Sequence, residues 1–185
     1  MSQYAHKINK SAARLTEMID SILNYSSAGS PDLNEVVDLN HIIENIKEDL
    51  EIKILEKHAV IEHKKMPLLN GSKILFHQLF YNLIANSLKF SRDNFDSHIK
   101  IDCSFDSEKL LITITDNGIG ISIENSLRIF NVFERLHSKD EYEGTGLGLA
   151  LCKKIVERHN GKMIYVKPEA TGAVFEITFP ADILH

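Results

Sequence analysis

Two asparagines and a lysine are spaced to lie on one face of a predicted helix. Asn82, Asn86 and Lys89 follow one another at steps of four and three residues, which places them on the same side. Ser72 stands where it can cap the start of this helix. Amide oxygens can bind a metal ion, and a lysine beside them suits a phosphate group. Taken alone, the same pattern is also explained by a solvated face.

Two glycine-rich segments carry the other candidate groups. Asp116 follows an apolar strand predicted over residues 110–115, and Gly118 and Gly120 after it let the backbone turn sharply beside a planar ligand. A carboxylate at this position can accept a hydrogen bond from an exocyclic amine. Residues 144–149 read Gly-Thr-Gly-Leu-Gly-Leu and lead into a helix, where backbone amides can bind phosphate. In isolation, the first segment is better explained as a simple turn.

The second glycine segment differs from other known phosphate-binding loops. Its G-x-G-x-G spacing follows a charged stretch, so it does not match the dinucleotide fingerprint, which follows a strand. The chain contains no G-x-x-x-x-G-K-[S/T] loop and none of the HRD and DFG signatures of eukaryotic-type protein kinases. These absences exclude the commonest nucleotide-binding classes.

Helix and strand signals alternate through the region that positions these segments. Helical periodicity covers residues 40–57, the segment after Ser72, and residues 147–159. Strand patterns cover residues 59–64, 99–105, 110–115, 163–167 and 174–179. Strands dispersed among helices favour an α/β (α+β) two-layer sandwich, with a mixed sheet and helices on one face.

The first segment predicts a separate helix. Ile8, Leu15 and Ile22 recur every seven residues, which is typical of a coiled-coil-type helix that packs along another helix. Residues 26–31 are rich in Ser, Gly and Pro and indicate a linker. We therefore expect two units, residues 1–30 with the helix and its linker, and residues 31–185 with the main domain.

Composition and charge narrow the classes of function. The 185 residues are 43% hydrophobic, which disfavours disorder, and no apolar run approaches the ~20 residues of a membrane helix. A formal net charge of −5 disfavours general binding to nucleic acid or to anionic membranes. Cys103 and Cys152 are expected to be reduced thiols, which suits a cytoplasmic protein, although their spacing alone leaves a disulfide open.

Together and in this order, the motifs resemble the catalytic, ATP-binding domain of sensor histidine kinases, in the superfamily shared with gyrase, the Hsp90 chaperones and MutL. Four boxes carry the resemblance: an N box at 82–91, a G1 box at 116–121, an F box at 129–135 and a G2 box at 144–150. The first helix resembles the second helix of the kinase dimerisation and phosphoacceptor hairpin. The chain thus looks like a C-terminal portion of a longer sensor kinase.

The resemblance implies a role for each matching residue. Asp116 would accept from the adenine amine, while Gly118 and Gly120 would shape the adenine pocket. Asn86 would bind Mg²⁺, with Asn82 and Lys89 near the phosphates. The loop amides that would cradle the phosphates belong to Gly144, Thr145, Gly146, Leu147, Gly148 and Leu149.

The resemblance also implies an ATP lid over residues 134–143. Phe130 and Phe133 would hinge this lid, which we expect to move when no triphosphate is bound. Arg135 would approach the γ-phosphate, so the implied catalytic residues are Asn82, Lys89 and Arg135. Ala173 departs from the family, in which Ser or Thr often lies near the adenine.

The implied function is transfer of the ATP γ-phosphoryl group to a histidine, for relay to a response regulator. ATP and Mg²⁺ are the implied cofactors, and a second copy of the chain is the implied dimer partner. None of the nine histidines is followed by the acidic residue and nearby proline of an acceptor site, His6 included. We therefore expect the chain to bind ATP without phosphorylating itself, and to act in the cytoplasm without membrane contact.

Two functions of other classes fit the sequence less well. An ATP-hydrolysing conformational switch of the same superfamily carries a glutamate that activates water, but this chain has Asn82 at that position. A dimerisation module without catalysis would have no use for Asp116, Asn86 and the glycine loops. The asparagine at position 82 and the retained nucleotide-binding motifs therefore favour the kinase.

Overall fold

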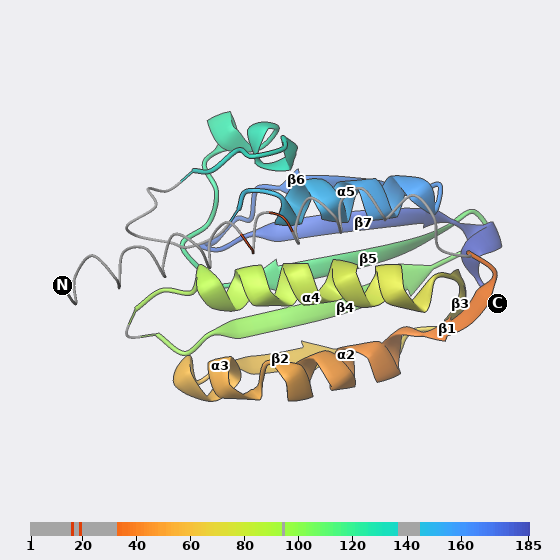
Figure 1. The fold of residues 1–185 in the computed structure, drawn as a ribbon, viewed down its shortest axis with the longest axis horizontal. Helices are drawn as coiled ribbons and strands as arrows, with labels where there is room; N and C mark the ends of the chain where they lie inside the picture. The colour runs from red at the N-terminus through yellow and green to blue at the C-terminus, as the bar shows by residue number, and fades with distance from the viewer. Residues whose placement is uncertain (1–15, 17–18, 20–32, 94, 137–144) are drawn as a thin grey trace.

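Figure 1 shows the computed structural model, which describes residues 33–93, 95–136 and 145–185, together with residues 16 and 19. Those last two residues are helical, and the rest of the predicted first helix and its linker lies outside the described residues. Gly144 and most of the predicted lid also lie outside them. The division at residue 30 therefore stays a prediction.

A five-stranded mixed sheet forms one layer of the domain. Its strands, in spatial order, are β2 (Val60–His63), β4 (His98–Phe105), β5 (Lys109–Asp116), β7 (Val174–Pro180) and β6 (Lys162–Val166). Strands β2 and β4 run parallel, and the other neighbouring pairs are antiparallel. Every second residue of β5 is buried, and because Asp116 continues this alternation, its carboxylate lies on the buried face.

Helices cover one face of this sheet, as Figure 1 shows for α2 (Leu39–Asp49), α4 (Lys73–Lys89) and α5 (Gly148–Arg158). The two-layer sandwich predicted from the sequence is confirmed. The core lies between the layers, and α4 fills its centre with Leu75, Phe76, Leu79, Phe80, Leu83, Ile84 and Leu88. Each such buried side chain contributes about 1.5–3 kcal/mol of transfer free energy.

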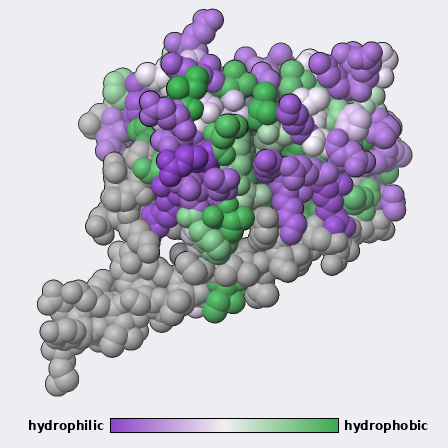
Figure 2. Space-filling view, turned by 90° about the horizontal axis from the view of Figure 1, so that it is seen from above, coloured by the Kyte–Doolittle hydropathy of each residue, from purple (hydrophilic) through white to green (hydrophobic). Residues whose placement is uncertain are grey.

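Most of the apolar residues are thus inside. The surface in Figure 2 is largely hydrophilic, with hydrophobic groups exposed between the polar ones. Among the described residues, the most exposed large hydrophobic side chain is that of Leu127, at 83%. Cys103 and Cys152 are free thiols, as expected. None of the described helices is both long and apolar enough to cross a membrane.

Several short elements were not predicted. Strand β1 (Glu35–Asp38) pairs with β3 (Leu68–Gly71) in a separate two-stranded antiparallel sheet. The described part of the chain also contains three 3₁₀ turns: η1 (Ile123–Asn125), η2 (Arg128–Phe130) and η3 (Ala181–Ile183). Elements of three or four residues give little periodic pattern, so the sequence reveals them only in part: β2, also four residues long, was predicted, whereas these were not.

The helix predicted over residues 40–57 is divided in two. Leu50 is buried and ends α2 with φ −103° and ψ 10°, and α3 (Glu51–Glu56) then runs without a buried residue. The apolar spacing alone did not predict this change of backbone conformation at Leu50.

Ser72 occupies the N-cap position of α4, but its side chain does not cap the helix. Its hydroxyl is buried and makes no capping hydrogen bond, which corrects the sequence interpretation. The backbone N–H of Ser72 instead donates to Nε2 of His159 at 3.2 Å, and Nδ1 of that ring lies 2.8 Å from the carbonyl oxygen of Ile155. His159 therefore joins the start of α4 to the end of α5.

Candidate functional site

A cavity of about 410 Å³ opens beside α4, between the end of β5 and the segment that leads into α5. It gathers every predicted site residue in the described part of the chain except Gly118. The predicted residues that line it are Asn82, Asn86, Lys89, Asp116, Gly120, Arg135, Thr145, Gly146, Leu147, Gly148 and Leu149. Segments far apart in the sequence thus meet at one place, as the motifs predicted.

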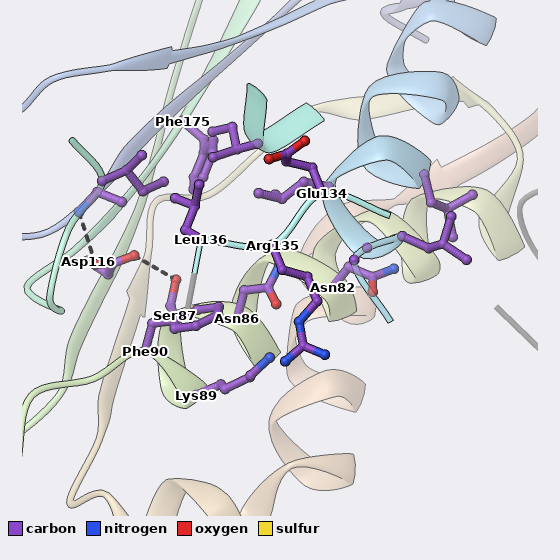
Figure 3. A pocket seen from close by; sticks show the side chains of 18 of the residues that line it. Asn82, Asn86, Ser87, Lys89, Phe90, Asp116, Glu134, Arg135, Leu136 and Phe175 are labelled. Atoms are coloured by element: carbon purple, nitrogen blue, oxygen red, sulfur yellow. Dashed lines mark hydrogen bonds between the residues drawn. The ribbon is translucent and has the colours of Figure 1, made fainter. Parts of the chain in front are cut away.

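One end of the cavity is closed by the carboxylate of Asp116. Its Oδ1 accepts backbone N–H groups of Gly118 at 2.9 Å and Ala173 at 3.0 Å. Its Oδ2 accepts the hydroxyl of Ser87 at 3.1 Å, as Figure 3 shows. Burial raises the pKa of the Asp116 carboxyl, and these hydrogen bonds offset the rise only in part.

Glycines make this arrangement of loops sterically possible. Gly118 lies behind the carboxylate, where a Cβ would come within 2.5 Å of the carbonyl oxygen of Phe90. Gly172 has φ +111°, and a Cβ there would overlap the carbonyl oxygen of Asp116. Gly120, at φ +77°, faces Gly172 in turn. The strand end and the loop before β7 can approach only because these positions lack side chains.

The other end of the cavity is polar. The Nδ2 of Asn82 donates to the carbonyl oxygen of Gln78 at 2.8 Å, which leaves its Oδ1 directed toward the start of α5. Figure 3 shows Asn86 and Lys89 on the same side, with the guanidinium of Arg135 close to them. This end therefore combines amide oxygens with two cationic groups, a set suited to a phosphate chain and a hard cation.

The described residues on either side of the predicted lid meet beside the cavity. The backbone N–H of Phe133 donates to the carbonyl oxygen of Gly146 at 3.1 Å. Both residues have positive φ, +64° and +76°, and a Cβ at Gly146 would lie 2.8 Å from the carbonyl oxygen of Glu134. An ion pair between Arg128 and Glu134 also links η2 to the start of the predicted lid. We call this junction the lid base.

Several lining residues were not assigned to the site from the sequence. They are Gln78, Tyr81, Ser87, Phe90, Ile119, Ile121, Ile129, Leu136, Leu151 and Phe175; Ala173 and Glu134, which also line the cavity, were placed near the adenine and at the start of the lid. Most of them are apolar and give the cavity walls that suit a planar ring. Phe175 comes from β7, opposite Ile114 of β5, so its place depends on strand pairing, which no local pattern reveals.

Comparison with known proteins identifies the family of this domain. Residues 71–183, more than half of the chain, match the family described as histidine kinase-, DNA gyrase B-, and HSP90-like ATPase. The chain is 37% identical over 164 residues to cyanobacterial phytochrome A of Nostoc sp. strain PCC 7120, which covers 88% of this chain. That match covers 21% of the relative, so the chain spans about a fifth of the relative's length.

Solved structures share the fold. The crystal structure of full-length ShkA in complex with AMPPNP superposes with a TM-score of 0.76, covering 97% of this chain and 38% of that one, at 20% identity. The catalytic domain of histidine kinase ThkA, in a nucleotide-free form, gives a TM-score of 0.67 at 25% identity. This second match covers 79% of this chain and 94% of that domain.

Proposed function

Because the chain belongs to the histidine kinase-, DNA gyrase B- and HSP90-like ATPase family, and carries the catalytic ATP-binding domain of a sensor histidine kinase, we propose that its cavity positions ATP for phosphoryl transfer to a histidine. One observation carries this proposal: the cavity holds a buried carboxylate at one end and amide oxygens with two cations at the other. That polarity matches a nucleotide, with its base and its phosphates at opposite ends.

The base would occupy the end closed by Asp116. The ionised carboxylate accepts a hydrogen bond from the exocyclic amine of adenine. Ile119, Ile121 and Phe175 line the same cavity and offer apolar surface to the faces of the ring. Ala173 acts here through its backbone N–H, which donates to Asp116, so the missing Ser or Thr hydroxyl leaves that contact intact.

The phosphates would occupy the end formed by α4 and the start of α5. Lys89 and Arg135 bring positive charge, and the amides of residues 145–149 lie at the start of a helix, where they favour an anion. The amide oxygen of Asn86 fits Mg²⁺, which prefers oxygen ligands and keeps several waters when it binds phosphates. Bound there, Mg²⁺ would neutralise negative charge on the phosphate oxygens.

The side chains lining the cavity favour transfer to histidine over hydrolysis. Activation of water needs a base, yet the described lining residues include only two carboxylates, Asp116 and Glu134. The first closes the adenine end, and the second pairs with Arg128 at the lid base. A neutral imidazole is already nucleophilic near pH 7. Its nitrogen can form the bond to the γ-phosphorus while the bond to the bridging oxygen of ADP breaks.

Two partners follow from this proposal. The first is a second copy of the chain, paired through the predicted N-terminal helix. The second is a response regulator that receives the phosphoryl group. We place this activity in the cytoplasm. All three statements rest on the proposed function and on the sequence of residues 1–30.

Labelling with γ-³²P ATP and Mg²⁺ tests the proposal. We expect the chain to bind ATP and to label a separately supplied acceptor hairpin with alkali-stable, acid-labile phosphate, but not to label itself. Release of inorganic phosphate without acceptor labelling would favour the ATPase. Stoichiometric acid-labile label on the chain alone would show that one of its own histidines is an acceptor, with His6 as the first candidate. Asp116→Asn serves as the binding-deficient control.

A further inference from the structure

The hydroxyl of Ser87 is buried at the adenine end of the cavity. Ser87 belongs to α4, is 4% exposed, and donates to Oδ2 of Asp116 at 3.1 Å. A carboxylate offers about four acceptor positions. The backbone N–H groups of Gly118 and Ala173 occupy both positions on Oδ1, and Ser87 occupies one on Oδ2. One position, on Oδ2, therefore remains for a ligand.

We propose that Ser87 is a positioning residue for nucleotide binding, because its hydroxyl fixes the carboxylate of Asp116 so that a single acceptor position faces the amino group of adenine. The inference rests on the proposed function. Ser87 acts through Asp116 and needs no contact of its own with the base. The two side chains come from α4 and β5, so their hydrogen bond also fixes the helix to the strand end that forms the pocket.

The charge of the carboxylate depends on the same contact. Burial favours the neutral form of Asp116, and the three hydrogen bonds favour the ionised form. Ser87 is the one side chain among those three donors. The titratable groups that share its surroundings are Tyr165 of β6, whose hydroxyl donates to the carbonyl oxygen of Ile121, and Tyr81, Lys89, Arg135 and Glu134 in the cavity lining. Removal of the Ser87 hydroxyl shifts Asp116 toward its protonated form.

This shift changes which base the pocket accepts. An ionised Asp116 accepts from a 6-amino group and opposes a 6-oxo group, since both oxygens are then acceptors. A protonated Asp116 can donate to a 6-oxo group instead. Loss of the hydroxyl should therefore weaken ADP binding and narrow the preference for ADP over IDP, most of all at acid pH. If Ser87 supported only the fold, its substitution would weaken the binding of ADP and of IDP equally.

Calorimetry with ADP and IDP between pH 5.5 and 8 tests the proposal on the whole chain. For Ser87→Ala we expect about a tenfold weaker ADP affinity at pH 7, in line with a lost hydrogen bond to a charged group. The acid limb of ADP binding should move to higher pH, and the ratio of ADP to IDP affinity should fall. Ser87→Thr should restore binding, and Ser87→Cys, a weaker donor of similar size, should give an intermediate result.

Ser97→Ala is the matched control. Ser97 is 1% exposed, does not line the cavity, and its hydroxyl makes no hydrogen bond within the described structure. We expect this variant to bind ADP like the wild type. Carbon-13 NMR of the aspartate carboxyls, assigned with Asp116→Asn, measures the pKa of Asp116 without nucleotide and should give a higher value in Ser87→Ala.

Two outcomes separate the inference from the proposed function. A wild-type chain that binds neither nucleotide overturns the proposed function. A wild type that binds ADP, with Ser87→Ala equal to it in affinity, in ADP preference and in the pKa of Asp116, overturns the role of Ser87 alone. Thermal unfolding of each variant, followed by circular dichroism, separates lost binding from lost folding.

Discussion

Asp116→Asn isolates the charge of the adenine-end carboxylate from its shape. Asparagine keeps an oxygen where Oδ1 accepts the N–H groups of Gly118 and Ala173. Its Nδ2 replaces Oδ2, and the Ser87 hydroxyl can turn to accept from it. The variant therefore retains all three internal contacts, and because the pKa of Asp116 is raised by burial, it also removes a charge that folding disfavours. We expect no loss of thermal stability at neutral pH.

The same substitution should weaken the binding of the nucleotide. In Asp116→Asn, an adenine amino group meets an amide NH₂, so a donor faces a donor. The lost charge-assisted hydrogen bond is worth about 1.5–3 kcal/mol. At 1.4 kcal/mol per factor of ten, ADP binding should weaken roughly 10- to 150-fold. The loss should be similar for adenosine, because the contact is made with the base.

Calorimetric titration with ADP and Mg²⁺ gives the dissociation constant of each protein. Asp102→Asn is the matched control, because its carboxylate lies on β4, pairs with Lys64 and Lys100, and does not line the cavity. We expect the control to bind ADP as the wild type does. A normal ADP affinity in Asp116→Asn, with its fold intact, would refute the placement of adenine at this end of the cavity.

Three further variants test other parts of the structure. Asn86→Ala should weaken binding of ATP with Mg²⁺ more than binding of metal-free adenosine, and equal losses by calorimetry would mean that Asn86 only supports the fold. Gly172→Ala should lower the thermal unfolding midpoint and reduce ADP binding, because its Cβ would overlap the backbone of Asp116 at φ +111°, a strain of about 1–3 kcal/mol; an unchanged midpoint would contradict this packing. Burial lowers the pKa of His159 in the folded protein. As the pH falls below 6.5, the unfolded chain therefore binds a proton at this residue more readily than the folded chain, and the free energy of unfolding decreases. His159→Gln keeps an acceptor for the Ser72 N–H, and urea unfolding should show a smaller loss of stability between pH 6.5 and 5; an equal loss would assign the acid sensitivity to another group.

Local patterns predicted the parts of the site that a single element supplies. The spacing of Asn82, Asn86 and Lys89 placed them on one face of a helix, and α4 is continuous through all three. The alternation of β5 likewise places Asp116 on the buried face. Both predictions needed only the period of the element, 3.6 or 2 residues, which the sequence shows directly.

Residues supplied by pairing between distant segments could not be predicted. The N–H of Ala173 reaches Asp116, 57 positions earlier in the sequence, because the pairing of β7 with β5 begins at the next residue, and nothing local fixes that register. Ser87 lies beside a predicted site residue, but its role depends on the hydrogen bond to the carboxylate of Asp116, which the local sequence does not show. The break at Leu50 has the same origin, since helical periodicity continues through it while the packing does not.

The lid base has a consequence for how this chain tolerates changes in length. The hydrogen bond from Phe133 to Gly146 joins the two residues that flank the predicted lid, and it does not depend on the length of the segment between them. For a loop whose ends are already fixed, each doubling of length costs only about 0.6 kcal/mol in closure entropy. Insertions or deletions between these residues therefore leave the cavity walls on α4 and β5 in place. A change in length therefore alters the segment that carries Arg135, while the walls that α4 and β5 supply keep their positions.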